Sequence, residues 1–592
     1  MKKLVSKYFL VPIFSFIFAN NICYNIVNII RTFKLEWSFN YIKSLVSLRD
    51  YHFLFGNLLL TLLFILIVIK YDKSFLLKLK REKGLPKEDG SYEYGSSRWS
   101  TKKEIKERFK VWNIGTKLEK GGVPVTYLDN KFYYDDEFDH TLIIGSTGSG
   151  KTQGFILPLV CNLASAGESM IINDVKGEIY SYTADFLKER GYDIKIINLR
   201  DAFASDGWNP LHLPYKYFKE GNIDEAGDLI ENFSRSLTKN LSSKDMYWEK
   251  SATSVLTALC YAIIEDAPKE SQVNLYSIYN LLVEHGSKMI ERQNSLDLYF
   301  KEKPFGNLAK NSYATGSFAK GETRATLFSV LSTVIKLFSD TGIANLTSRT
   351  DFELGDIGKN KMAVFLIIPD EKESRHELAS LFIDQCYQAL VNTAQNSPDG
   401  KLPIRTNFIL DEFSNTAPIT NMGNKITVSR SRQIRFYLAI QNLQQLKDTY
   451  KESADTIKSN CTNWVYLLTS DNESAKEIST RLGRYSISSS RVSVSGRLDS
   501  KDLNYSNDKS LLGRDLLMPD ELMRFKYGES IFMKSRMYPV KAKSLPFDKY
   551  GFKIKYIPLP TEHKNYVIDV FNLDEYRKKN MKKEIDSLLE IE

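Results

Sequence analysis

An eight-residue stretch, residues 145–152, reads GSTGSGKT and fits the pattern G-x-x-x-x-G-K-[ST]. A short apolar run, residues 141–144, precedes it directly, and residues 153–160 (QGFILPLV) follow it with the character of a helix. A strand, a glycine-rich loop and a helix are the context in which this pattern holds phosphate groups. The sequence therefore predicts an α/β protein built around a nucleotide-binding loop.

The residue types of this loop suit a phosphate ligand. Glycines let backbone N–H groups turn inward around phosphates, and the helix N-terminus adds a partial positive charge. We expect Lys151 to reach the β- and γ-phosphates of ATP and Thr152 to bind Mg²⁺, while Pro158 is expected to kink the helix. The predicted nucleotide-binding residues are Gly145, Ser146, Thr147, Gly148, Ser149, Gly150, Lys151 and Thr152.

A second strand should deliver acidic groups to the same site. Residues 407–412 (NFILDE) form a mostly apolar run that ends in Asp411 and Glu412. We expect Asp411 to join Thr152 in the Mg²⁺ shell and Glu412 to polarise an attacking water. Such a pair favours a hydrolase over a kinase, so Lys151, Asp411 and Glu412 are predicted catalytic residues. The alternative is a strand end with two solvated acids.

Three further polar residues lie near the next strand, residues 436–440. Gln441 follows that strand and either senses the γ-phosphate or caps a loop. Arg430 and Arg432 precede it. They are either solvated residues at a helix end or arginine fingers that reach a neighbouring subunit's nucleotide. The spacing alone favours the solvated interpretation.

The remaining pattern indicates a large α/β body with a helical part. Residues 169–174, 193–198 and 362–368 are further buried-strand candidates, which implies a mainly parallel sheet covered on both faces. Asp174 ends one of these strands, where it either lines a ligand crevice or belongs to a turn. Residues 215–340 carry apolar positions at helical spacing and few strand runs, so we expect an inserted all-α domain.

Two apolar runs near the N-terminus predict a membrane anchor. Residues 8–30 and 51–69 each come close to the ~20 residues that a spanning helix needs. The first also resembles a signal peptide, but no A-x-A site follows it and a second apolar run does. Lysines and arginines cluster before the first run and after the second. We therefore expect a multi-pass protein of the cell membrane with both termini and the ATPase body cytoplasmic.

The amino-acid composition excludes few classes of binding partner. The net charge of +9 over 592 residues permits a nucleic acid or an anionic lipid partner without demanding one. The five cysteines are far apart and never form C-x-x-C, and the six histidines are scattered. This pattern argues against a disulfide framework or a zinc site and fits a reducing compartment.

Together these residues resemble the type IV coupling proteins, the TraG/TraD-like family of conjugation ATPases, over most of the chain. The ordered motifs that carry the resemblance are residues 95–99 (GSSRW), His140 with the glycine loop and Pro158, and residues 174–178 (DVKGE), 208–210 (WNP), 369–370 (PD), 410–413 (LDEF), 440–446 (IQNLQQL) and 516–521 (LLMPDE).

The resemblance implies a RecA-like P-loop ATPase domain with an inserted all-α domain, preceded by two transmembrane helices. It implies a homo-hexamer with ATP sites between subunits. Its role would be to dock relaxase-bound single-stranded DNA at a type IV secretion channel and to drive transfer during conjugation. By position, Arg430 resembles the family's trans-acting arginine and Gln441 its nucleotide-sensing glutamine. The family often has glycine beside that arginine, whereas serine stands here, so Arg432 stays a rival.

Three alternatives stay open at this point. An FtsK-like pump for double-stranded DNA would carry more spans and a C-terminal winged helix. A receptor whose nucleotide only sets assembly would need no hydrolysis. A secretion variant would carry protein cargo without DNA.

The predicted domain plan follows the motifs along the chain. It comprises a membrane anchor at 1–70, a linker with the start of the ATPase domain at 71–135, the RecA-like domain at 136–214 and 341–560, the all-α domain at 215–340 and a C-terminal tail at 561–592.

Overall fold

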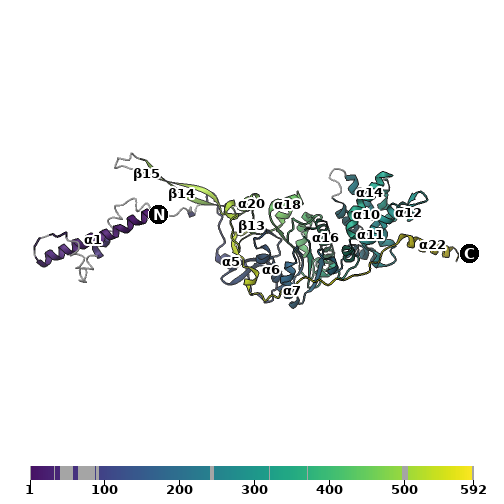
Figure 1. The fold of residues 1–592 in the computed structure, drawn as a ribbon, viewed down its shortest axis with the longest axis horizontal. Coiled ribbons are helices and arrows are strands. Elements are labelled where there is room, and N and C mark those ends of the chain that lie inside the picture. The colour runs from purple at the N-terminus through teal and green to yellow at the C-terminus, as the bar shows by residue number, and fades with distance from the viewer. Residues whose placement is uncertain are drawn as a thin grey trace. The chain divides into compact units, whose positions relative to one another are not determined.

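The structure is a computed structural model that describes residues 2–32, 34–35, 37–39, 58–63, 87–88, 92–239, 246–318, 321–369, 371–495 and 504–589. The chain divides into two compact units, residues 1–91 with 487–512 and residues 92–486 with 513–592. Figure 1 shows the fold of the chain. The nucleotide loop and both acids lie in the second unit.

The N-terminal unit begins with a long helix, α1 (Lys2–Thr32), which includes the first predicted span at 8–30. It also contains β1 (Lys87–Glu88), which pairs with β14 (Arg484–Ser495), and β14 lies between β1 and β15 (Asn504–Asp515). The second predicted span, 51–69, lies outside the described residues except for the helical stretch 58–63.

No single helix among the described residues meets both the length and the apolarity that a bilayer crossing requires. One bent pair of helices, Glu322–Ser339 with Thr341–Thr347 at 81°, passes on length and composition together.

A nine-stranded sheet forms the centre of the second unit, in the order β17-β16-β13-β5-β12-β11-β6-β10-β7. The seven strands from β13 to β7 are parallel, β16 runs antiparallel to β13, and β17 runs antiparallel to β16. The strands are β5 (Thr141–Gly145), β6 (Ser169–Asp174), β7 (Asp193–Asn198), β10 (Met362–Ile367), β11 (Thr406–Leu410), β12 (Ile434–Ile440), β13 (Asn463–Leu468), β16 (Glu529–Lys534) and β17 (Val540–Lys543).

Alternate residues of these buried strands face opposite sides of the sheet, as the pleat requires. Leu142 and Ile144 of β5 join one apolar core, whereas Ile143 joins the other. Both faces are therefore covered, which explains why strands such as β5 (TLIIG) and β10 (MAVFLI) are mostly apolar. The first core includes α16 (Glu373–Gln395), α17 (Met422–Ser429), α18 (Leu443–Tyr450), α19 (Ser453–Asn460), α20 (Asn472–Leu482) and α21 (Pro519–Leu522).

The other face is covered by α6 (Leu157–Ser165), α7 (Glu178–Glu189) and a small antiparallel sheet. That sheet has the order β2-β4-β3. It consists of β2 (Lys110–Trp112), β3 (Val123–Leu128) and β4 (Lys131–Asp135), and α5 (Lys102–Arg108) precedes it.

A helical region separates β7 from β10 in the chain. Its helices are α8 (His212–Lys219), α9 (Ile223–Thr238), α10 (Met246–Asp266), α11 (Leu275–Gly286), α12 (Ser295–Glu302), α13 (Leu308–Ser317), α14 (Glu322–Ile335) and α15 (Thr341–Thr347), with a two-residue hairpin of β8 (Met289–Ile290) and β9 (Gln293–Asn294). Apolar residues repeat at helical spacing along α10, where Ala252, Val255 and Leu259 are all fully buried.

The end of the chain returns to this helical region rather than leaving the body. Ile557 donates its N–H to the Ser181 carbonyl at 3.0 Å, and Phe571 donates its N–H to the Ser277 hydroxyl at 3.0 Å. Phe571 and Leu573 are buried. The final helix, α22 (Leu573–Leu589), contacts α12, since Arg577 lies 3.4 Å from Glu302, and its label stands next to the C-terminus in Figure 1. The predicted C-terminal tail at 561–592 is thus in part an integral piece of the packed body.

Candidate active site

The glycine loop stands at the carboxyl end of β5, between that strand and a helix. Gly148 and Gly150 have φ angles of 79° and 85°, a left-handed conformation that glycine adopts without steric cost. The first helical turn, Thr152–Ile156, is a π-helix that passes into α6. Pro158 is the second residue of α6, and because the helix runs on from the π-helical turn, its missing N–H leaves a carbonyl of that turn without its helical hydrogen bond. The irregular turn expected near this proline therefore precedes it as a π-helical turn.

Lys151 and the two acids are brought together across 260 residues of sequence separation or more. The Lys151 Nζ lies 3.1 Å from Asp411 Oδ1 and 2.9 Å from Glu412 Oε1. All three side chains are mostly buried. Asp411 follows β11, and Glu412 has a left-handed φ of 53°, which is uncommon for a residue with a side chain. The turn after β11 thus presents both carboxylates to one ammonium group.

Amide groups hold the second acid in place. Gln441 Nε2 donates to Glu412 Oε2 at 2.9 Å, and Asn415 Nδ2 donates to the same oxygen at 2.7 Å. Gln441 stands at the carboxyl end of β12, which lies between β5 and β11. Residues from three adjacent strand ends therefore converge, which is where ligands bind in open parallel sheets.

The opposite charges in this site shift one another's pKa values. Burial raises the pKa of the Asp411 carboxyl, although the Lys151 ammonium opposes the rise. Burial alone would lower the pKa of Lys151, but the carboxylates of Asp411 and Glu412 outweigh burial and raise it. The lysine is thus charged over the neutral pH range, and the carboxylates supply the countercharge.

Asp174 lines the same region from the end of β6. Its carboxylate accepts a hydrogen bond from the Tyr180 N–H at 2.8 Å, so it caps the first turn of α7. Burial raises the pKa of Asp174 to about 6. In the same 174–178 segment, Glu178 accepts a hydrogen bond from the Gln153 side chain. Both alternatives for Asp174 are realised, because it belongs to a turn and also lines the cavity.

A cavity of about 960 Å³ lies over these groups. Its walls contain the glycine loop, the 174–178 segment, both acids and Gln441. The Ser149 hydroxyl of the loop is buried and has no hydrogen-bond partner among the described residues. A phosphate oxygen would satisfy this donor, and Thr152 and Asp411 offer the oxygen ligands that Mg²⁺ prefers. The residues present therefore fit a nucleotide with Mg²⁺.

The two arginines that were considered as arginine fingers do not line this cavity. Arg430 and Arg432 stand in a short 3-10 turn before β12, at the amino edge of the sheet, whereas the glycine loop is at the carboxyl edge. Arg430 Nη1 lies 3.0 Å from Asp139 Oδ1, and its side chain is 60% exposed. Arg432 Nη1 donates to the Val428 carbonyl at 3.1 Å. The fold thus does not bring either arginine to the nucleotide cavity of its own chain.

Three contributors to the site were not predicted from the sequence. Asn415 binds Glu412, Asn173 Nδ2 donates to the Asp411 carbonyl at 2.7 Å, and the Tyr527 ring packs against Gly150. Asn415 follows Glu412 by three residues, so its presence in the same turn was a usable signal. Tyr527 is far away in sequence and no local pattern marks it.

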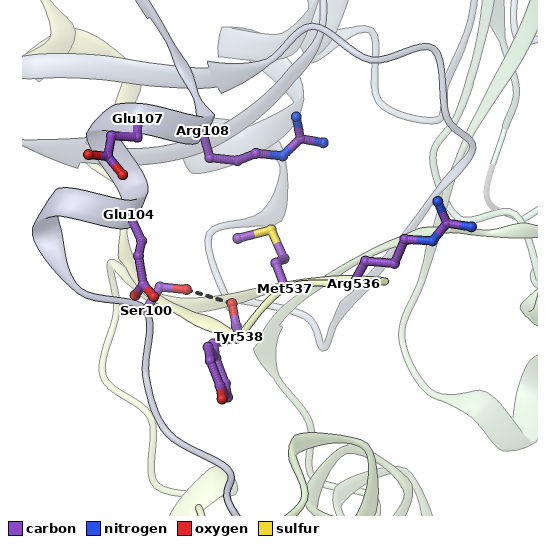
Figure 2. Close-up of a pocket in the computed structure, with 7 residues that line it drawn as sticks. All are labelled: Ser100, Glu104, Glu107, Arg108, Arg536, Met537 and Tyr538. Carbon is purple, nitrogen blue, oxygen red and sulfur yellow. Dashed lines mark hydrogen bonds between the residues drawn. The ribbon is translucent and has the colours of Figure 1, made fainter.

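A second cavity, of about 640 Å³, shares no lining residue with the first. Figure 2 shows its side chains, with the Ser100 hydroxyl bonded to the Tyr538 carbonyl at 2.6 Å. Glu104 is held there by Arg98 at 2.6 and 2.9 Å, and Arg108 pairs with Glu137. Glu104 and Arg108 thus already have partners, and we assign no ligand to this cavity.

The fold and the site together define a P-loop nucleotide-binding protein whose parallel sheet carries a helical region. The chain belongs to the family described as Type IV secretory system Conjugative DNA transfer, whose model matches residues 93–564. This match confirms the resemblance drawn from the motifs.

Curated relatives agree with the family. The chain is 25% identical over 467 residues to a conjugal transfer protein TraG of Escherichia coli, covering 73% of this chain and 71% of the relative. It is 23% identical over 424 residues to a protein VirD4 of Rhizobium radiobacter, covering 69% of this chain and 57% of that protein.

Solved structures show the same fold. The coupling protein TrwB in complex with sulphate matches with a TM-score of 0.57 at 15% identity, covering 81% of this chain and 100% of that chain. TrwB in complex with ADP and Mg²⁺ matches with a TM-score of 0.56 at 14% identity, covering 82% and 99%. The predicted RecA-like α/β fold with a helical part is thereby confirmed, while the two transmembrane helices stay predictions.

Proposed function

We propose that this chain is a membrane-anchored coupling ATPase that presents relaxase-bound single-stranded DNA, or a protein substrate, to a type IV secretion channel and drives its transfer by ATP hydrolysis. The observation that carries the proposal is the contact of one buried lysine with two acids beside a nucleotide-sized cavity. Family membership supplies the conjugative context.

The chain's own groups suggest how hydrolysis proceeds. Lys151 exchanges its contacts with Asp411 and Glu412 for the β- and γ-phosphates, because it is the lysine of the glycine loop that surrounds them. That exchange frees one oxygen of Glu412 to accept a proton from a water molecule. The water oxygen forms the new bond to the γ-phosphorus as the bond to the leaving ADP oxygen breaks. Bound Mg²⁺ would neutralise charge on the β- and γ-phosphate oxygens.

Gln441 and Asn415 hold the remaining Glu412 oxygen at 2.9 and 2.7 Å. With that oxygen occupied, the acid keeps one orientation while the other oxygen faces the water. Such positioning of a base is worth several powers of ten in rate at most. Because Gln441 is bonded to the acid that faces the γ-phosphate, it senses through Glu412 whether the γ-phosphate is present.

Arg430 completes the site from a neighbouring subunit in this proposal. Its own nucleotide cavity lies at the opposite edge of the sheet, so only a second copy can receive its guanidinium. A homo-hexameric ring with sites between subunits satisfies this geometry, since head-to-tail contacts close into rings. Arg432, which donates to Val428, is the rival.

The DNA contact is expected to be electrostatic. A motor that moves along a strand contacts phosphates rather than base edges, so binding should weaken with salt and ignore sequence. A salt-insensitive, base-specific complex would contradict this part of the proposal.

Membrane attachment belongs to the proposal as well. The apolar runs at 8–30 and 51–69 support two spans, with both termini and the ATPase body in the cytoplasm and a short outer loop at 31–50. Single cysteines placed in that loop should react with an impermeant thiol reagent on intact cells. Cysteines placed beyond residue 70 should not, and the reverse pattern would refute the orientation.

The experiment that tests the function uses the full chain in detergent and in mating cells. Lys151→Ala should abolish ATP hydrolysis, and Glu412→Gln should lower kcat by about 10²-fold or more while nucleotide still binds. Glu473→Gln, which changes an exposed acid, serves as the control. Plasmid transfer should fall with hydrolysis.

The alternatives predict other results. If Glu412→Gln stops hydrolysis yet keeps full transfer, the chain is a nucleotide-gated receptor. If double-stranded DNA stimulates hydrolysis and single-stranded DNA does not, an FtsK-like pump is favoured. Normal transfer by Lys151→Ala would end the motor proposal.

A further inference from the structure

The amino edge of the central sheet carries a charged cluster that the proposed hydrolysis does not use. Lys534, at the end of β16, is almost fully buried and contacts Asp135, Glu137 and Asp139. The Lys534 Nζ lies 2.8 Å from Glu137 and 2.8 Å from Asp139. Because the lysine sits among the three carboxylates, they form an ion-pair cluster rather than a metal site.

One carboxylate of this cluster also holds the candidate arginine finger. Asp139 is 4% exposed and binds Lys534 through Oδ2 and Arg430 Nη1 through Oδ1, the latter at 3.0 Å. Asp135, at 1% exposure, binds Lys534 but makes no recorded contact with Arg430. The two buried aspartates are therefore alike in burial and in their lysine partner, and they differ in their contact with Arg430.

The neighbouring histidine fixes the backbone that bears Arg430. His140 Nδ1 accepts the N–H of Phe436 in β12 at 3.0 Å, so Nε2 carries the ring proton and donates to the Ser429 hydroxyl at 3.3 Å. Burial and the charge of Arg435 lower the pKa of His140 to about 4, which keeps the ring neutral. Asp139 thus contacts the side chain of Arg430, and His140 contacts Ser429, the residue before it.

The rest of the guanidinium is open to a partner. Arg430 lines a cavity of about 520 Å³ together with Phe138, Lys401, Arg405 and others, so the surroundings are basic. The glycine loop of the same chain stands at the opposite edge of the sheet. The seven residues of β12 span that distance, which is roughly 20 Å at about 3.3 Å per residue. A basic cavity with an anchored, exposed arginine suits a polyphosphate carried by a second copy of the chain.

We propose that Asp139 is a positioning residue, which aims the Arg430 guanidinium at the nucleotide of a neighbouring subunit. A guanidinium offers five N–H donors, so Arg430 can keep its ion pair with Asp139 while its other N–H groups donate to phosphate oxygens. Asp139 directly precedes His140 and β5, the strand that enters the subunit's own glycine loop. The inference rests on the proposed intersubunit ATPase.

A purely structural role for Asp139 makes a different prediction. If the aspartate served only to neutralise Lys534, then Asp135→Asn and Asp139→Asn would have similar effects. Both would lower stability, and neither would change kcat in particular. The matched pair of variants therefore separates positioning from neutralisation.

The test measures steady-state ATP hydrolysis by the full chain assembled in detergent or vesicles, with thermal unfolding as a check on folding. Arg430→Ala should lower kcat by about 10³-fold, the size expected of a missing arginine finger. Asp139→Asn should lower kcat by about tenfold with the KM for ATP changed less than twofold, as expected for a misplaced catalytic group. Asp135→Asn should keep kcat within about twofold of the parent.

The double variant Asp139→Asn with Arg430→Ala decides the matter. If Asp139 acts through Arg430, the double variant should be no slower than Arg430→Ala alone. Multiplying losses would overturn the inference, and so would equal kcat losses in Asp139→Asn and Asp135→Asn. If Asp139→Asn fails to fold, Asp139→Glu replaces it. That variant keeps the charge but shifts the guanidinium, so its kcat should fall, and an unchanged kcat overturns the inference.

Failure of the proposed function is distinguishable from failure of this inference. No hydrolysis by the parent chain refutes the proposed ATPase and the inference together. An Arg430→Ala variant with the parent's kcat refutes the inference and leaves Arg432 as the rival arginine of the intersubunit site. A large loss in Arg430→Ala with parental kcat in Asp139→Asn refutes the inference alone.

Discussion

At the scale of single residues, the site is defined by charges that share partners. Lys151 contacts two carboxylates, Glu412 contacts one ammonium and two amides, and Asp139 contacts Lys534 and Arg430. In each case a buried ion has more than one countercharge or donor, which offsets the free-energy cost of removing it from water. Replacing one partner of such an ion by another therefore costs less free energy than removing a partner altogether.

Asp174 provides a pH test at this scale. Burial raises its folded pKa to about 6, above the ordinary value of 3.8. Stability from the protonated form is then fully present below about pH 4 and is lost as the pH rises through about 6, by roughly 1–3 kcal/mol. Asp174→Asn keeps an oxygen to accept the Tyr180 N–H. The variant should therefore gain Tm relative to the parent at pH 8 and not at pH 4, in the absence of nucleotide. An equal change at both pH values would contradict the account.

At the scale of elements, the parallel strands and the loop after β5 were predictable because their signals are local. An apolar run with a glycine loop or an acid at its end specifies both the strand and the edge where the site forms. Residues 169–174, 193–198 and 407–411 therefore lie in β6, β7 and β11 or directly after it.

Other features depend on packing between distant segments and left no local pattern. Tyr527 meets Gly150, and the segment after Ile557 follows α7 toward the helical region. The pairing of Asp139 with Arg430 joins residues that are almost 300 positions apart, so only the fold reveals it.

The C-terminal segment yields a prediction about stability. Phe571 is 4% exposed in the helical region, so Phe571→Ala should cost about 3–5 kcal/mol of unfolding free energy. Val567, 99% exposed on the same segment, is the matched control, and Val567→Ala should change stability by about 0.5 kcal/mol or less. Urea unfolding followed by circular dichroism measures both. Equal effects would mean that the segment does not stabilise the helical region.

At the scale of the whole molecule, the account requires an assembly. The nucleotide cavity and Arg430 occupy opposite edges of one sheet, so a single chain holds two incomplete halves of a site. Head-to-tail contact of copies joins one half to the other and gives a ring when it closes. Hydrolysis in one subunit then depends on its neighbour, which is how a ring can pass a strand from site to site.

The most direct test of this central claim mixes two inactive variants of the full chain, Lys151→Ala and Arg430→Ala. The first lacks a working nucleotide loop and retains the arginine, and the second has the opposite defect. In random equal mixtures, about a quarter of the interfaces join an intact loop to an intact arginine. Hydrolysis should therefore recover to about a quarter of the parent's rate. A mixture that stays at the average of its two inactive components would contradict the intersubunit site.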